Sequence, residues 1–220
     1  GNTVDMVGGD FYDINSDQEP INDRDGQLIN LTIDYVFNDS WSLKSVTSSQ
    51  SMDRFLRDDL DSTDANLFGQ NNYTEESDSF GQELILNFSS DRLDVLSGVM
   101  YFEEELYGEV KVPLTNICFL LAPDACGTPV GEFLNGGNYL QDGDVDIEAW
   151  GAYVEATYSL SDNWTLIGGL RYNYEERDGT GSFIFDAISL NVPTNERESW
   201  KGLKPRVTLQ YSTNDSMLIH

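Results

Sequence analysis

The sequence predicts an all-β chain: a segment of an antiparallel transmembrane β-barrel whose long strands are joined into hairpins. Two observations support this prediction. Apolar and polar residues alternate over stretches of about a dozen residues, longer than the roughly five or six residues of a typical soluble strand. Tight polar turns also alternate with connections of about 20–40 residues, as in outer-membrane barrels with short periplasmic turns and long extracellular loops.

The clearest hairpin covers residues 147–177. In its first strand the even positions from Trp150 to Leu160 are apolar or aromatic, and the odd positions are mostly small or polar, as at Glu155. A turn at residues 161–163 follows, and the even positions then resume a mostly apolar face from Trp164. One face is therefore apolar with aromatic residues at its ends, and the other is polar.

The same unit recurs along the chain. Its first strands are predicted at residues 31–37, 80–88 and 203–211, its turns at 38–40, 89–92 and 213–215, and its return strands at 41–50, 93–105 and 216–219. We expect about eight strands in all. Both faces of residues 93–102 are apolar, so the alternation does not assign the two sides of the strand at residues 93–105.

Three long connections, residues 55–79, 106–146 and 178–199, are rich in Asp, Asn, Gly and Pro and are expected to be extracellular loops. Aromatic residues near the strand ends fit a girdle at each membrane interface. Those near the turns are Trp41, Phe88, Tyr158, Trp164 and Tyr211, and those toward the loops are Tyr101, Tyr172 and Tyr174. The alternatives are a self-contained eight-stranded membrane barrel, acting as an adhesin or structural protein, and a soluble carbohydrate-binding β-sandwich, whose strands also alternate.

The chain carries 39 acidic and 12 basic side chains, a formal charge of −27. This surplus argues against nucleic acid as a partner and against a polybasic patch for anionic lipid. The acidic residues lie largely in the predicted loops, so we expect the outward face of the strands to be nearly uncharged. The longest uninterrupted apolar run, residues 117–122, is far shorter than the ~20 residues of a membrane-spanning helix.

Carboxylates at Asp142, Asp144, Asp146 and Glu148 are the best candidates for a Ca²⁺ site, because Ca²⁺ prefers hard oxygen ligands. The run lacks the glycine and the distant glutamate of an EF-hand. A solvated acidic loop is the alternative interpretation. The alternation of these residues also predicts that they share one face of a strand entering the barrel lumen.

Cys118 and Cys126 lie in one connection that contains several prolines. They suit a short disulfide formed in an oxidising compartment, and two free thiols are the alternative. A structural zinc site needs about four Cys or His ligands, and His220 is the only histidine. We expect no cofactor. Without an interior histidine or a cleft motif, the sequence also argues against an enzyme.

Residues 149–178, AWGAYVEATYSLSDNWTLIGGLRYNYEERD, resemble the barrel of TonB-dependent outer-membrane receptors. Residues 41–63, 79–105 and 204–220 resemble it too, so the resemblance covers most of the chain outside the long connections. In that family a barrel of about 22 strands surrounds a plug. The resemblance therefore implies that residues 1–220 are part of one barrel domain, without plug or signal peptide. It also implies an open, curved sheet with unpaired edges.

The resemblance further implies a setting and a function. The chain is expected in the bacterial outer membrane, in contact with its lipid and, through the missing plug, with the TonB energy-transducing system. It would serve energy-coupled uptake of a scarce nutrient, by default a ferric siderophore or similar chelate. The acidic loops leave glycans, peptides and cobalamin-like ligands open. Aromatic side chains in the loops, such as Tyr73, Phe133 and Tyr139, are candidate ligand contacts.

Charged residues on the polar strand faces are expected to face the lumen. On the lipid face an Arg or Lys near the midplane would cost roughly 2–4 kcal/mol. These residues would pair with one another or with a plug, or they would line the ligand path. The set comprises Asp34, Glu83, Glu155, Arg171, Arg177, Lys204 and Arg206.

Overall fold

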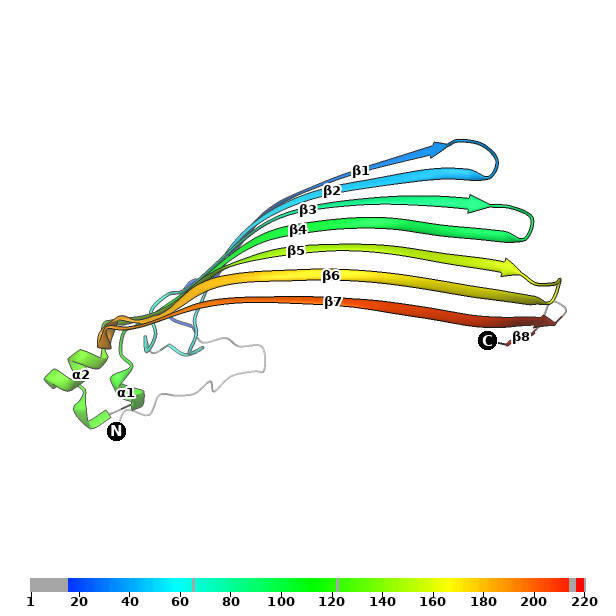
Figure 1. Cartoon of the computed structure of the whole chain (residues 1–220). Coiled ribbons are helices and arrows are strands. Elements are labelled where there is room, and N and C mark those ends of the chain that lie inside the picture. Colours follow the sequence, from blue (N-terminus) through cyan, green and yellow to red (C-terminus); the bar gives the residue numbers. More distant parts are fainter. Residues whose placement is uncertain (1–15, 65, 122, 214–216, 220) are drawn as a thin grey trace.

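A computed structural model describes residues 16–64, 66–121, 123–213 and 217–219. They form one antiparallel 8-stranded sheet whose strands follow one another in sequence order (Figure 1). The strands are β1 Ile21–Val36, β2 Trp41–Asp58, β3 Asn71–Ser89, β4 Leu93–Leu114, β5 Gly137–Ser159, β6 Trp164–Phe185, β7 Leu190–Thr213 and β8 Met217–Ile219. The predicted all-β hairpin architecture is confirmed.

Short helices occupy the connections at the end of the sheet opposite the tight turns. The β4–β5 connection contains α1 Cys118–Leu121, the 3-10 helix η1 Pro123–Ala125 and α2 Pro129–Leu134. A second 3-10 helix, η2 Asp186–Ile188, joins β6 to β7. No helix in the described part of the chain is long and apolar enough to cross a membrane.

The strands continue well beyond the residues whose alternation predicts them. β4, β5 and β6 have 22, 23 and 22 residues, and the connections shrink to residues 59–70, 115–136 and 186–189. About half of the predicted loops at residues 55–79 and 106–146, and most of the predicted loop at residues 178–199, is therefore strand. Where both faces of a strand meet water, pairing can continue although the contrast between apolar and polar faces is lost.

The register assigns every strand residue to one of two faces, because cross-strand partners project to the same side. Leu43 pairs with Leu86, and Val99 pairs with Ala152, on the side that we call the outward face. The strand at residues 93–105 is thereby resolved: Val95, Val99 and Tyr101 face outward, and the alternate positions lie on the inward face. Outward apolar side chains are highly exposed, for example Val207 at 78%, as expected for a surface that contacts lipid.

Aromatic pairs close the outward apolar band at both ends. Near the turns, Trp41 lies 4.7 Å from Phe88 and Trp164 lies 4.7 Å from Tyr211, measured between ring centroids. At the other end Trp150 contacts Tyr172 and Tyr174. At about 3.3 Å per residue, the path along β5 from Trp150 to Tyr158 is about 26 Å, which at a strand tilt of about 40° is about 20 Å of height, comparable to the ~25 Å apolar band of outer-membrane barrels.

The sheet is open in the described residues. β1 pairs with β2 alone, β7 pairs with β6 and the short β8, and no pairing joins β1 to the other edge. Figure 1 shows one continuous curved sheet. The described chain therefore forms neither a closed eight-stranded barrel nor the two packed sheets of a sandwich.

Candidate ligand-binding face and outer acidic surface

The inward face within the apolar band carries the predicted lumenal charges, and several of them pair with each other. Asp34 lies 3.4 Å from Lys44 on the neighbouring strand, and Glu155 lies 3.2 Å from Arg206. Nearer the loops, Arg177 bridges to Glu175 at 2.7 Å. The inward face is thus a polar surface whose charges are partly neutralised within the sheet.

A groove on the inward face runs over β6 and β7. Arg171 and Lys204 are cross-strand partners in it, and Met100, Asn173 and Trp200 contribute to its lining. Arg171 donates one hydrogen bond from Nε to Oδ1 of Asn173 at 2.7 Å and another from Nη2 to Sδ of Met100 at 3.6 Å. The guanidinium is therefore held in place by neutral groups.

An apolar and aromatic cluster lies on the inward face near the loop end of the sheet. Tyr73, Val110 and Phe183 belong to one cross-strand line, and Tyr139 pairs with Phe185 two residues further along the strands, on the same face. The rings of Tyr139 and Phe183 are 5.2 Å apart, edge to face. Tyr139 and Phe185 also pack against the small core formed by Val112, Leu114 and Ile117. We call Tyr73, Val110, Tyr139, Phe183 and Phe185 the mouth cluster.

Two of the predicted ligand contacts, Tyr73 and Tyr139, therefore share a face, and the third does not join them. Phe133 lies on α2 and is 53% exposed. The sequence reasoning missed Phe183 and Phe185 because residues 178–199 were predicted as loop. Their i, i+2 spacing was the available signal, since it places both on one face of a strand.

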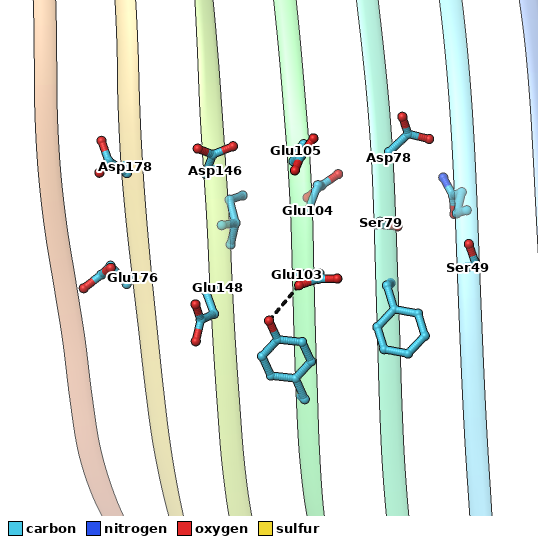
Figure 2. Close-up of a pocket in the computed structure, with 14 residues that line it drawn as sticks. Ser49, Asp78, Ser79, Glu103, Glu104, Glu105, Asp146, Glu148, Glu176 and Asp178 are labelled. Atoms are coloured by element: carbon cyan, nitrogen blue, oxygen red, sulfur yellow. Dashed lines mark hydrogen bonds between the residues drawn. The ribbon is translucent and has the colours of Figure 1, made fainter.

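Beyond the apolar band, the outward face is acidic (Figure 2). Glu103, Glu148 and Glu176 form one cross-strand line. Asp78, Glu105, Asp146 and Asp178 form the next. These seven residues, the outer acidic rows, lie on the same face as Tyr101 and Trp150. The expectation that the outward face of the strands is nearly uncharged is wrong above the band, because the strands continue unbroken there and place these acidic residues on the outward face.

The calcium candidates belong to the same outward face. Asp142, Asp144, Asp146 and Glu148 occupy alternate positions of β5 and continue the parity of Trp150, so they do not point into the lumen. Ser182 donates a hydrogen bond to Asp142. No group of three or more His, Cys, Asp or Glu side chains in the described residues is arranged to hold a metal ion. Calcium binding by these residues stays a prediction.

Arg197 is the main cation at the edge of the outer acidic rows. It bridges to Glu176 and lies 3.5 Å from Asp178. Hydrogen bonds from Tyr174 and Arg197 lower the pKa of the Glu176 carboxyl, and Glu176 in turn raises the pKa of Arg197. Positive charge from β7 thus offsets part of the acidic surface at that side.

The β4–β5 connection, residues 115–136, joins two strand ends that carry the mouth cluster, and it contains a disulfide. A disulfide joins Cys118 to Cys126, and the Cys118 side chain is 1% exposed. Asn135 accepts a hydrogen bond from the backbone N–H of Cys118 through its Oδ1 at 3.1 Å. The Thr128 hydroxyl caps α2 by accepting from the Gly131 N–H.

An apolar outward band between aromatic girdles, a polar inward face and long antiparallel hairpins define the wall of an outer-membrane β-barrel. The chain belongs to the TonB dependent receptor-like, beta-barrel family, whose family model matches residues 2–219. The protein is therefore placed in the bacterial outer membrane, in a family of receptors and transporters rather than enzymes. No curated protein matches the chain.

Solved structures share this fold at low sequence identity. The ferric yersiniabactin uptake receptor FyuA from Yersinia pestis matches 89% of the chain with a TM-score of 0.70 and 14% identity. The siderophore receptor PiuA from Acinetobacter baumannii matches 88% with a TM-score of 0.62 and 14% identity. The RagAB peptide importer matches 89% with a TM-score of 0.54 and 10% identity. The chain spans 27%, 31% and 27% of these proteins, respectively.

Proposed function

We propose that this chain is part of the barrel wall of a TonB-dependent receptor that takes up a ferric siderophore or a similar chelate. The observation that carries the proposal is the inward face, where the aromatic mouth cluster lies above a polar, charged wall. Large nutrients with both apolar and polar groups fit such a surface, because aromatic rings supply contact area and fixed polar groups supply orientation. The siderophore receptors among the similar structures support the same substrate class.

In this proposal residues 1–220 form one segment of a larger closed barrel, and the sheet edges at β1 and β7 pair with further strands. Open edges of that length would otherwise promote aggregation. Coupling to TonB runs through a plug inside the completed barrel, and the outward band contacts outer-membrane lipid. The chain has no enzymatic role and needs no cofactor.

Tyr73 and Tyr139 are the proposed ligand contacts, joined by Phe183 of the same cluster. Tyr73 is 36% exposed on the inward face and so is available to a ligand. Phe133 would contact a ligand only from α2, in the β4–β5 connection that contains the disulfide. A peptide is the second candidate substrate, favoured by the apolar character of the mouth cluster and by the fold shared with a peptide importer.

The test uses cells that lack their own chelate receptors and produce the complete receptor that carries this chain. Uptake of radiolabelled iron is measured from ferric citrate, a ferric catecholate and an uncharged ferric trihydroxamate, alongside uptake of labelled short peptides. We expect receptor-dependent uptake of at least one chelate, abolished when TonB is deleted. Uptake of peptides alone would favour the second candidate, and uptake of none of these substrates would contradict the proposal.

A further inference from the structure

Two positive charges stand side by side on the inward face, within a chain whose formal charge is −27. Among the residues that the structure describes, four basic ones face inward within the apolar band: Lys44, Arg171, Lys204 and Arg206. Lys44 and Arg206 each have an acidic partner. Arg171 and Lys204 are directly opposite one another on β6 and β7, and neither forms a salt bridge within the described residues.

Like charges directly opposite each other in a sheet are destabilising. The neighbours of Arg171 do not relieve this repulsion. On the β5 side its cross-strand partner is Tyr153, whose hydroxyl already donates to Glu83. Its own hydrogen bonds go to the neutral acceptors of Asn173 and Met100. The nearby carboxylates Glu155 and Glu175 are engaged by Arg206 and Arg177.

Arg171 lies on β6, and both neighbouring strands, β5 and β7, are present, so the sheet flanks this side chain on both sides. Any further partner of Arg171 must therefore approach from the lumen. Both Arg171 and Lys204 are exposed there, and a side chain built on Gly202 beside them would meet nothing within 4 Å. The groove is thus open at the cationic pair.

We propose that Arg171 and Lys204 bind an anionic oxygen group, such as a carboxylate, of the transported cargo. This inference rests on the proposed function and narrows its substrate class to negatively charged chelates. The planar guanidinium can present paired N–H donors to a carboxylate, and Lys204 adds a mobile ammonium. The outer acidic rows do not oppose this choice, because they face away from the lumen.

The test measures binding to outer membranes that contain the complete receptor. The probes are ferric citrate, which is anionic, and an uncharged ferric trihydroxamate. We expect Arg171→Gln to weaken ferric citrate binding by about 10-fold or more, as for loss of a hydrogen bond to a charged group, and to leave the uncharged chelate unaffected. Arg171→Lys should retain most of the affinity. Arg92→Gln, the same charge change in the exposed β3–β4 turn, is the matched control.

The outcomes separate the two levels of the proposal. If the wild-type receptor binds neither chelate, chelate uptake fails and this inference fails with it. If the wild type binds ferric citrate and Arg171→Gln binds it equally well, the inference alone is overturned. Preference of the wild type for the uncharged chelate overturns it too. Arg171→Gln could also weaken the binding of both chelates equally, or lower the unfolding temperature without changing either affinity. Either result would show that the anionic partner of Arg171 belongs to the receptor itself, and would also overturn the inference.

Discussion

The hydroxyl of Tyr153 donates a hydrogen bond to Glu83 across the width of an intervening strand, at 3.0 Å. Tyr153 belongs to β5 and Glu83 to β3, and the tyrosine ring crosses β4 directly over Gly98. A Cβ atom built on Gly98 would lie only 2.5 Å from the ring Cζ and the hydroxyl oxygen of Tyr153. The missing side chain at position 98 is therefore what allows one hydrogen bond to connect three strands on the inward face.

Replacing Gly98 by Ala should displace the Tyr153 ring and break its bond to Glu83. We expect destabilisation of about 1–3 kcal/mol, typical of overpacking, seen as a lower temperature for loss of the folded band in unheated-versus-heated gel electrophoresis. Gly108→Ala is the control, because position 108 is also on the inward face of β4 and a Cβ there meets nothing within 4 Å. Equal behaviour of the two variants would show that the Tyr153 contact does not matter for stability.

The assignment of the outward face can be tested on adjacent residues of β7. Val207→Lys places a charge in the lipid-facing band and should destabilise the inserted protein by roughly 2–4 kcal/mol. Thr208→Lys places the same charge on the inward face and should cost much less. Folding into lipid vesicles, titrated with urea, measures both. A larger penalty at position 208 would reverse the two faces.

The disulfide should stabilise the β4–β5 connection without holding the sheet together. Replacing Cys118 and Cys126 together by Ser should cost this connection about 2–3 kcal/mol through loop entropy. Hydrogen exchange should accelerate in residues 115–136 and remain unchanged in the β4 and β5 segments that lie within the apolar band. Unchanged exchange at residues 115–136 in the double variant would contradict this role.

Asp186 should make the junction between β5 and η2 sensitive to acid. The side-chain amide and backbone N–H of Asn138 donate to its carboxylate and lower the Asp186 pKa. A carboxyl whose folded-state pKa is lowered contributes stability that is present above its unfolded pKa and is lost as pH falls through the folded value. Exchange protection near residues 137–140 should therefore drop when the pH is lowered below the usual aspartate range.

The variant Asp186→Asn should remove this pH dependence and leave protection low at every pH. Asp162→Asn, in the exposed turn between β5 and β6, serves as the control and should behave like the wild type. Persistence of the acid-induced loss in Asp186→Asn would assign it to another group.

The parts of the molecule inside the membrane were predictable from sequence. Alternation from Trp150 to Leu160 and from Trp164 onward identifies strands and their apolar faces, because lipid on one side and a polar lumen on the other impose opposite chemistry on neighbouring residues. Outside the membrane both faces contact water. The extensions of β5 back to Gly137 and of β6 to Phe185 therefore lack the contrast between an apolar and a polar face, and most of those residues were predicted as loops.

The residues of the candidate site were also predictable only in part from the sequence. Tyr73 and Tyr139 were identified by residue type, but their common face, and the inclusion of Phe183 and Phe185, depends on the register of β3 to β6. The unmatched pair of Arg171 and Lys204 is likewise a property of the β6–β7 register, since these residues are far apart in the chain. Asp146 and Glu148 were expected to face the lumen, and the register of β4 and β5 places them on the outward face instead.

By itself, the sequence determined the fold class and the membrane-spanning hairpins, because these depend on the two-residue period of hydrophobicity within each strand. The family came from the resemblance of its strand–turn–strand segments. Only the tertiary structure decided how far the strands extend, that the outer acidic rows face away from the lumen, and which inward charges find partners. The physical reason is that pairing register relates residues on different strands, and a local pattern carries no information about which residue lies opposite which.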